Sequence, residues 1–522
     1  MRIALRSGLV AIALCSLAAC GGGGGGGGGP IGGGGGNGNG GTYTPGVFPA
    51  RATLAGQCTA FNEKMFLRSW TNELYLWYDE VQDQNPDSIA DVIAYFTQLK
   101  TFQTTPSGNQ KDRFHFDLDT DEWIALSQSG QSIGYGAEFL LFSSTPPRNN
   151  AVGFVEPNTP AAAAGVTRGM QIVSVNGVDF INDNTQSGVN TLAEAFSPSA
   201  TGETFNFVFQ LPGGGTTAPI SLTSADITHT PVLITDTIDQ AGQKVGYLLF
   251  NDHIATSEAQ LIDAVTALKA DNISDLVLDI RYNGGGYLDI ANELAFMIAG
   301  PTRTTMSNQI FERLVFNNKN LTRDPISGEL LAPGTAFHDV ALDVGDLGDP
   351  VAGTPLPHLD LPRVYVITGP NTCSASESII NGLRGVNVQV FLIGSTTCGK
   401  PYGFYPQDNC GTTYFSIQFQ GVNAMGDGEY PDGFAAQNQA GQSSIKLAGC
   451  SVADDFTKQL GDPTEGRLKA ALDFRASGNV TCPAANGFAP GAQLKPGQLK
   501  MSAADGRMFK NPARENRIMR VH

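Results

Sequence analysis

A serine and a lysine in the second half of the chain could act together as a nucleophile and its base. Ser374 stands between a predicted strand, residues 364–368, and a predicted helix, and Lys400 follows the next predicted strand, residues 388–393. Side chains at these positions can meet when strand, helix and strand fold into one compact unit. The pairing matters because a serine hydroxyl is a weak nucleophile without a base beside it.

The same residues also have a purely structural interpretation. Ser374 and Glu377 have the spacing of a helix capping box, and Lys400 alone would be an ordinary surface lysine. Two features favour chemistry instead. A residue between a strand and a helix lies in the crevice at the carboxyl edge of the sheet. The start of the helix also stabilises a developing negative charge.

Three glycines end another predicted strand of the same sheet. The strand covers residues 276–280, and the turn Gly284-Gly285-Gly286 follows it. A glycine turn leaves backbone N–H groups available to an anion. These groups could therefore stabilise the oxyanion that forms when a serine attacks a carbonyl.

A lysine serves as a base only when its amine is neutral, so its pKa must fall from about 10.4 to about 7–8 through burial among apolar groups. His253 is the best-placed histidine, at the end of a predicted strand, and is a weaker candidate for the base than Lys400. Apolar surroundings for Lys400 are offered by the Cys398 region and by Tyr402, Phe404 and Tyr405.

Composition bounds the architecture and excludes one class of partner. The chain has 522 residues, enough for two to four domains. Its formal net charge of −17 argues against a nucleic-acid partner, because phosphate contacts need clustered Lys and Arg. Its six histidines are scattered and no C-x-x-C motif occurs, so we expect no metal and no cofactor.

The first residues are typical of an exported lipoprotein. Arg2 and Arg6 precede an apolar stretch, residues 9–14, and Leu-Ala-Ala leads to Cys20. The pattern resembles a bacterial lipoprotein signal, which implies removal of residues 1–19 and a lipid on Cys20. An ordinary cleaved signal with an incidental cysteine is the alternative.

A glycine-rich tether, residues 20–44, follows the predicted signal. A lipid and a tether predict a protein anchored to the bacterial cell envelope without a membrane-spanning helix. Gly21 lacks the aspartate associated with inner-membrane retention, so the outer membrane is favoured, facing the periplasm or the cell surface.

Six cysteines remain once Cys15 and Cys20 are set aside. An even number in an exported protein suggests disulfide bonds, although six allow 15 pairings. Cys398 and Cys410 bracket a short loop that contains Lys400, and this pair is favoured.

The rest of the chain divides into four parts. Residues 45–130 are predicted to be helical, residues 131–228 β-rich, residues 229–483 α/β, and residues 484–522 a polar, disordered tail. The β-rich part is expected to form a small domain of its own, and the α/β part to hold the sheet that carries the serine and the lysine.

Apolar spacing predicts helices at residues 62–78 and 87–99. Ser257 and Gln260 predict a capping box at the start of the helix that follows the strand of residues 245–250.

Residues 131–228 resemble a PDZ domain. The likeness rests on a proline-containing turn, residues 156–161, and on the runs Ala164-Gly165, Gly169-Met170-Gln171-Ile172 and Asn176-Gly177, with Met170 in place of the usual aspartate. By this resemblance, the backbone of Gly134-Tyr135-Gly136-Ala137 holds the carboxylate of a peptide that adds to the sheet edge. A small β domain without a ligand is the alternative.

The ordered motifs, from residue 131 to near residue 400, resemble the carboxy-terminal processing peptidases, also called tail-specific proteases. They comprise the β-rich domain, residues 278–286, residues 373–377 and Gly399-Lys400. The resemblance implies a multidomain protein: a helical N-terminal region, a PDZ-like domain and an α/β serine peptidase domain of ββα repeats in a crotonase-like spiral.

The resemblance also assigns roles to residues. Ser374 becomes the nucleophile, Lys400 the general base, and the backbone N–H groups of Gly286 and Ala375 the oxyanion donors. Polypeptides, bound through their C-termini, become the substrates.

The chain departs from the family pattern beside the lysine. Phe404 stands where glutamine is common, and Pro401 stands where glycine is usual. Another residue must therefore orient Lys400. The candidates are Gln407, Gln418 and Glu429.

We therefore expect a lipid-anchored extracytoplasmic serine endopeptidase with a Ser–Lys dyad. A catalytically impaired peptide-binding scaffold is one alternative. A hydrolase of a non-peptide ester or amide is another, because fold alone does not set the substrate.

Overall fold

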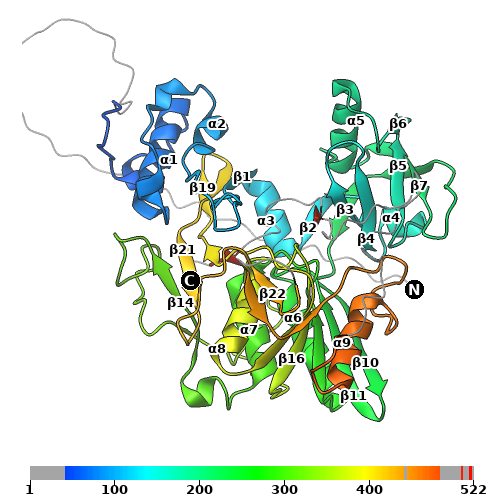
Figure 1. The fold of residues 1–522 in the computed structure, drawn as a ribbon. Coiled ribbons are helices and arrows are strands. Elements are labelled where there is room, and N and C mark those ends of the chain that lie inside the picture. The colour runs from blue at the N-terminus through cyan, green and yellow to red at the C-terminus, as the bar shows by residue number, and fades with distance from the viewer. Residues whose placement is uncertain (1–41, 440–443, 483–506, 509–516, 520–522) are drawn as a thin grey trace, which may run out of the picture. The chain divides into compact units, whose positions relative to one another are not determined.

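The structure is a computed structural model that describes residues 42–439, 444–482, 507–508 and 517–519 (Figure 1). The predicted signal, Cys20 and all but the last residues of the predicted tether lie outside these ranges. Among the described residues, no helix has both the length and the apolar character needed to cross a membrane.

A six-stranded sheet lies at the centre of the second half of the chain, in the order β10-β11-β12-β16-β17-β24. β10 is antiparallel to β11, and the other neighbours are parallel. The strands are β10 (Val232–Gln240), β11 (Gln243–Phe250), β12 (Asp275–Asp279), β16 (Arg363–Thr368), β17 (Gln389–Gly394) and β24 (Gly449–Ser451). The predicted βαβ arrangement of residues 245–280 is confirmed.

Helices cover both faces of this sheet (Figure 1). Leu276 and Leu278 pack into the core that contains three of the helices, whereas Val277 packs into the core that contains α9. This alternation explains the continuous apolar runs of the strands, because both faces are buried. The helices are α6 (Ser257–Ala270), α7 (Leu288–Ala299), α8 (Ala375–Gly385) and α9 (Gly466–Ala476).

The capping box predicted at Ser257 is wrong. Thr256 is the N-cap of α6, and the Ser257 hydroxyl donates to the Ile254 carbonyl (2.6 Å). The Gln260 side chain accepts the N–H of Val232 instead (3.0 Å), so it connects the helix to the sheet. Tertiary contacts therefore replace the local cap.

The first described region is helical, as predicted, but its second helix is shorter than expected. The predicted helix of residues 62–78 is α1 (Ala60–Leu74), whereas that of residues 87–99 is reduced to α2 (Val92–Phe96). The Asp91 side chain accepts the N–H of Ala94 and so sets the start of α2. The remaining elements are η1 (Arg51–Thr53), η2 (Tyr78–Glu80), η3 (Pro86–Ser88), β1 (Phe116–Asp119) and α3 (Thr120–Ser129).

Residues 131–228 form several short strands around a core of their own, which includes Phe139, Ile172 and Phe207. β3 pairs with β4, and β5 lies between β6 and β7. The elements are β2 (Gln131–Gly134), β3 (Ala137–Ser143), β4 (Asn149–Val155), α4 (Pro160–Ala163), β5 (Gln171–Val175), β6 (Val178–Asp179), α5 (Gln186–Phe196), β7 (Thr204–Gln210), β8 (Ile220–Thr223) and β9 (Ala225–Thr228).

Short strands surround the α/β part. β14 and β18 both pair with β21, and β1 of the helical region pairs with β20. These elements are β13 (Gly286–Tyr287), η4 (Thr305–Ser307), β14 (Ile310–Phe316), β15 (Thr335–Ala336), β18 (Tyr402–Gly403), β19 (Gln407–Asn409), β20 (Thr412–Phe415), β21 (Phe419–Val422), β22 (Phe434–Ala436) and β23 (Ile445–Leu447).

Two buried arginines hold the residues that precede the glycine turn. Arg281 donates to Asp454 (2.7 Å) and to Glu465 (2.8 Å). Arg168, from the β-rich part, donates to the same Asp454 (2.6 Å) and to the hydroxyl of Tyr282 (2.6 Å). Buried charges are tolerated only when paired and hydrogen-bonded in this way, so the network fixes the position of Arg281 and Tyr282.

Three disulfide bonds are present among the described residues: Cys58–Cys410, Cys373–Cys398 and Cys450–Cys482. The predicted Cys398–Cys410 pair is therefore wrong. Cys410 lies in the turn between β19 and β20, with its Cα 5.5 Å from that of Cys58. Cys398 is buried, with its Cα 5.1 Å from that of Cys373. The prediction chose two cysteines that are close in sequence. In the fold, β20 pairs with β1 of the helical region, and the turn before β20 brings Cys410 to Cys58 in that region.

Two parts of the predicted disordered tail are strands. β25 (Arg507–Met508) pairs with β3, and β26 (Arg517–Ile518) pairs with β13. For these residues the prediction of disorder is wrong, because contacts with distant strands order a segment that has no periodic pattern of its own. The rest of residues 484–522, apart from Met519, lies outside the described residues.

Candidate active site

Ser374 connects β16 to α8 in an unusual backbone conformation, with φ 61° and ψ −115°. A non-glycine residue at positive φ costs on the order of 1–3 kcal/mol and persists only where its surroundings impose it. The side chain is fully buried, and its Oγ has no hydrogen-bond partner. The backbone N–H donates to Glu377 (3.0 Å), so the glutamate caps the helix start while the serine hydroxyl is left uncommitted.

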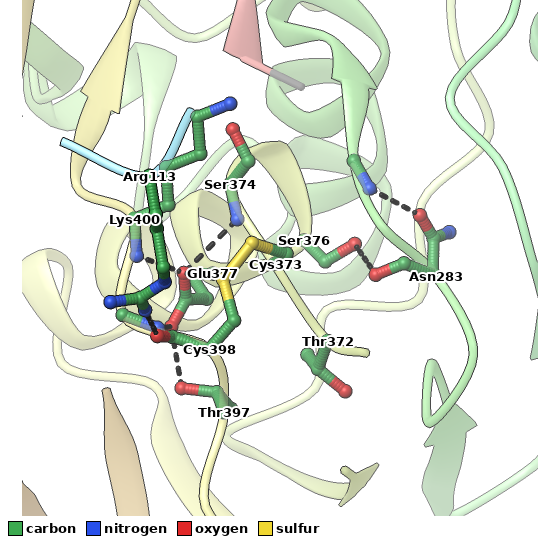
Figure 2. The surroundings of a disulfide bond; sticks show 12 residues. Arg113, Asn283, Thr372, Cys373, Ser374, Ser376, Glu377, Thr397, Cys398 and Lys400 are labelled. Atoms are coloured by element: carbon green, nitrogen blue, oxygen red, sulfur yellow. Dashed lines mark hydrogen bonds between the residues drawn. A yellow bond between two sulfur atoms is a disulfide. The ribbon is translucent and has the colours of Figure 1, made fainter. Parts of the chain in front are cut away.

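The amine of Lys400 is buried beside two aromatic rings, and one of them, Phe404, is among the predicted surroundings. The side chain is 1% exposed, and Nζ lies 4.7 Å from the centre of the Phe114 ring and 4.9 Å from that of Phe404. In Figure 2 the side chains of Ser374 and Lys400 extend in the same direction, away from the carboxylate of Glu377. The structure therefore places the two predicted residues on the same side of the site.

One carboxylate holds both loops. Glu377 accepts hydrogen bonds from the N–H groups of Ser374 (3.0 Å), Gly399 (2.9 Å) and Lys400 (2.8 Å), and from the hydroxyl of Thr397 (2.5 Å) (Figure 2). Burial raises the pKa of Glu377, and the bonds from Thr397, Lys400 and Gly399 oppose this rise. The contact sets the separation of the serine loop from the lysine loop.

A disulfide connects the same two loops. Cys373 immediately precedes Ser374, and Cys398 lies two residues before Lys400. The two sulfur atoms and the Glu377 carboxylate lie together, a combination that could hold a metal ion if the thiols were reduced. In the disulfide neither sulfur is a thiolate, so the cluster as it stands offers no thiolate ligand.

The glycine turn is built for close backbone approach. Gly286 has φ +138°, and a Cβ there would lie 2.3 Å from the carbonyl oxygen of His253, so another residue would clash. His253 N–H donates to Gly285 O (3.1 Å), and Tyr287 N–H donates to His253 O (2.8 Å). Because backbone groups alternate along an extended chain, the N–H of Gly286 faces the opposite edge.

Asn283 ties the glycine turn to the serine loop. Its carbonyl accepts the N–H of Cys373 (3.1 Å) and the hydroxyl of Ser376 (3.0 Å). Ala375 is the first residue of α8, where a backbone N–H has no acceptor within the helix. The two predicted oxyanion donors, Gly286 and Ala375, therefore belong to loops that are hydrogen-bonded to each other.

His253 is not equipped to be the base. Asn283 Oδ1 accepts the N–H of Gly285 (2.9 Å), so it must also accept from His253 Nδ1 (2.9 Å). The proton is thereby assigned to Nδ1, and the buried Nε2 has no partner. Burial lowers the pKa of His253 to about 4, which makes the imidazole a weak base.

The three residues considered for orienting Lys400 have other partners. Gln418 bonds both backbone groups of Tyr405 (3.3 and 3.1 Å), Gln407 accepts from Arg51 (2.9 Å), and Glu429 accepts from Gln420 (2.9 Å). Glu377 instead fixes the backbone of Lys400. Sequence reasoning assigned Glu377 to the helix cap alone, although a glutamate beside a candidate nucleophile was a usable signal.

The predicted carboxylate loop joins β2 to β3. Gly136 has φ +80°, and a Cβ there would lie 2.3 Å from Thr159. The carbonyls of Tyr135 and Gly136 accept the N–H groups of Ala161 (2.9 Å) and Glu156 (2.7 Å). The tight turn that the loop needs is therefore present, and its binding of a peptide stays a prediction.

Comparison with known proteins shows what part of this chain resembles. Residues 244–403 match the model of peptidase family S41. A carboxyl-terminal-processing protease from Picosynechococcus sp. is 26% identical over 283 residues, which cover 53% of this chain and 56% of that protein. The chloroplastic C-terminal processing peptidase of Tetradesmus obliquus is 27% identical over 199 residues, which cover 36% and 42%. The chain thus spans about half the length of these relatives.

A solved structure assigned to the S41 proteases, from Bacteroides fragilis, has the same fold. Its TM-score is 0.58 at 23% identity, and the match covers 80% of this chain and 98% of that one. Residues 244–403 are thus an α/β domain of the S41 type. The chain thus contains a region that matches peptidase family S41, and it is similar to carboxyl-terminal-processing proteases over about half of its length.

Acid should weaken the fold through His253. In the unfolded chain the imidazole takes up a proton near its ordinary pKa of 6.5, whereas in the folded chain it stays neutral to about 4. The folded state therefore has its full stability above pH 6.5 and becomes less stable as the pH falls below this value. Between pH 6.5 and 5 the loss is about 2 kcal/mol. Urea unfolding of the parent and of His253→Asn, at several pH values between 6.5 and 5, measures this loss of unfolding free energy.

The unfolding free energy of His253→Asn should depend less steeply on pH than that of the parent. Leu321→Asn is the control, because that side chain is 73% exposed and does not titrate, so it should leave the slope unchanged. Parallel profiles for the parent and His253→Asn would contradict the assignment of a buried neutral imidazole.

Proposed function

We propose that the chain is a serine peptidase in which Ser374 is the nucleophile and Lys400 the general base. One observation carries the proposal. A buried serine hydroxyl without a hydrogen-bond partner lies on a strained backbone, on the same side of one carboxylate as a buried lysine amine. Strained backbone and unpaired buried polar groups both lower stability, so they persist mainly where function requires them.

In the proposed reaction the Ser374 oxygen attacks a peptide carbonyl and the neutral Lys400 amine takes the hydroxyl proton. The negative charge that forms on the carbonyl oxygen is held by the N–H groups of Gly286 and Ala375. Lys400 then returns the proton to the leaving amine, and water hydrolyses the acyl-enzyme. The Ser374–Lys400 hydrogen bond that this requires would close when a substrate is bound, as catalytic contacts often do.

We propose further that residues 131–228 are a PDZ-like domain that binds substrate peptides through their C-termini. The tight loop at Gly136 and the edge of β3 support this part, because β25 adds to that edge as an antiparallel strand, as a bound peptide would. Lipid anchorage at Cys20 and a place in the bacterial cell envelope complete the proposal, supported by the sequence pattern of residues 1–44.

A peptide-binding scaffold without turnover is a second candidate. It is favoured by Phe404, which stands where the family commonly has a glutamine. The two candidates differ in whether the serine reacts, so an activity assay separates them.

Removing either proposed catalytic group should abolish hydrolysis of an unfolded polypeptide. Ser374→Ala should lower kcat/KM by at least about 10³-fold, because no nucleophile remains. Lys400→Ala should lower it by about 10²- to 10⁴-fold, the usual contribution of a general base. Lys244→Ala is the control, since that lysine is half exposed. Equal turnover by all four proteins would refute the dyad.

The disulfide beside the site should matter for activity and not only for stability. Cys373–Cys398 and Cys450–Cys482 close loops of similar length, with separations of 25 and 32 residues. Replacing either pair by serines should therefore cost a similar free energy of unfolding, about 3 kcal/mol.

Only loss of Cys373–Cys398 should also lower kcat/KM tenfold or more, because the serine and lysine loops then separate more easily. Urea unfolding and polypeptide hydrolysis, measured on both double variants, check this. Equal losses of activity in the two variants would show that the bond beside the site has no special role.

A further inference from the structure

Residues 517–519 lie as an extended strand between the two sides of the candidate active site. On one side, Arg517 and Ile518 pair in parallel with Gly286 and Tyr287. On the other side, Ile518 forms a bridge with Phe404, and Met519 N–H donates to the Phe404 carbonyl (3.2 Å). A segment more than 100 residues away in sequence thus fills the gap between the glycine turn and the loop that follows Lys400.

The strand occupies the edge at which a substrate would meet the oxyanion donor. Gly285 O and Tyr287 N are bonded to His253, so the N–H of Gly286 faces β26. Figure 2 draws the faint red ribbon of β26 beyond the ends of the Ser374 and Lys400 side chains. A peptide could not pair with this edge while the strand is there.

The side chain of Ile518 is 2% exposed and packs into an apolar core. The place that it occupies, called here the Ile518 pocket, borders a small cavity that is also lined by the apolar side chains of Trp123, Leu126, Ile254 and Tyr287 and by Ser127, Asp252 and His253. An aspartate at this position would lose its hydration, and the Asp252 carboxylate on the same cavity wall would repel it. The pocket therefore suits a branched aliphatic side chain.

The same tail also contacts the second predicted peptide-binding edge. Arg507 and Met508 add antiparallel to β3 at Leu141 and Leu140, on the strand that follows the predicted carboxylate loop. Residues 507–522 contain five basic residues and one acidic residue, whereas the whole chain has a net charge of −17. The charge of the tail thus favours docking onto the remainder of its own chain.

We propose that the edge between Gly286–Tyr287 and Phe404 binds an extended peptide with an aliphatic side chain in the Ile518 pocket, and that residues 517–519 hold this site as an intramolecular ligand. The inference rests on the proposed peptidase function. A tethered ligand competes at a high effective concentration, so substrate must displace it before the serine can act. The tail thus indicates which side chain the site prefers, and by occupying the site it lowers the activity of the free enzyme.

The first experiment releases the tail. Ile518→Asp and deletion of residues 507–522 should each raise kcat/KM for an unfolded polypeptide tenfold or more. Leu321→Asp is the matched control, because it adds the same charge at a position that is 73% exposed, and it should change nothing. Measurable activity that neither change raises would overturn the proposal.

The second experiment has a readout independent of turnover. A fluorescent peptide of residues 511–522 is titrated, by polarisation, against Ser374→Ala proteins with and without residues 507–522. The peptide should bind the protein that lacks residues 507–522 at least tenfold more tightly than it binds the full chain. A scrambled peptide, and one carrying the Ile518→Asp change, should bind neither.

The two experiments separate failure of this inference from failure of the proposed function. Peptide binding to the deleted protein without turnover in any variant would refute the peptidase proposal and keep the peptide site. Equal binding to both proteins, or binding of the scrambled peptide, would refute the intramolecular ligand whether or not the chain is a peptidase.

Discussion

The geometry of the site depends on the buried carboxylate of Glu377. This group accepts the backbone N–H of both Ser374 and Lys400, and it also bonds Thr397 and Gly399. A buried carboxylate is costly unless donors surround it, and here the donors come from two loops that approach each other only in the folded chain. The need to satisfy one buried carboxylate therefore positions the proposed nucleophile and the lysine together.

Other constraints converge on the same small region. The disulfide of Cys373 and Cys398 joins the loops that Glu377 bonds, and Asn283 joins the serine loop to the glycine turn. Since these contacts fix the backbone, Ser374 can be held at positive φ with an uncommitted hydroxyl. Rigid surroundings around a strained residue are the expected design of a site that must be organised before its substrate arrives.

The sequence predicted local structure well and long-range partners less well. The central strands and the places of Ser374 and Gly286 followed from apolar runs and turn residues, which are local signals. The disulfide partner of Cys398 did not, because the folded chain brings Cys373 to it across α8 and β17. Phe114 beside Lys400 and the strand at Ile518 were missed for the same reason. Pairing between distant segments leaves no periodic pattern.

The most direct test of the account is the reaction of Ser374 with a fluorophosphonate probe, located by mass spectrometry and timed in the parent and in Glu377→Gln. The account predicts labelling at Ser374 in the parent and at least tenfold slower labelling in the variant, because an amide NH₂ would face backbone N–H groups where an oxygen now accepts them. The variant's fold is checked by circular dichroism. Equal labelling rates, or labelling of a different residue, would contradict the claim that Glu377 organises the site.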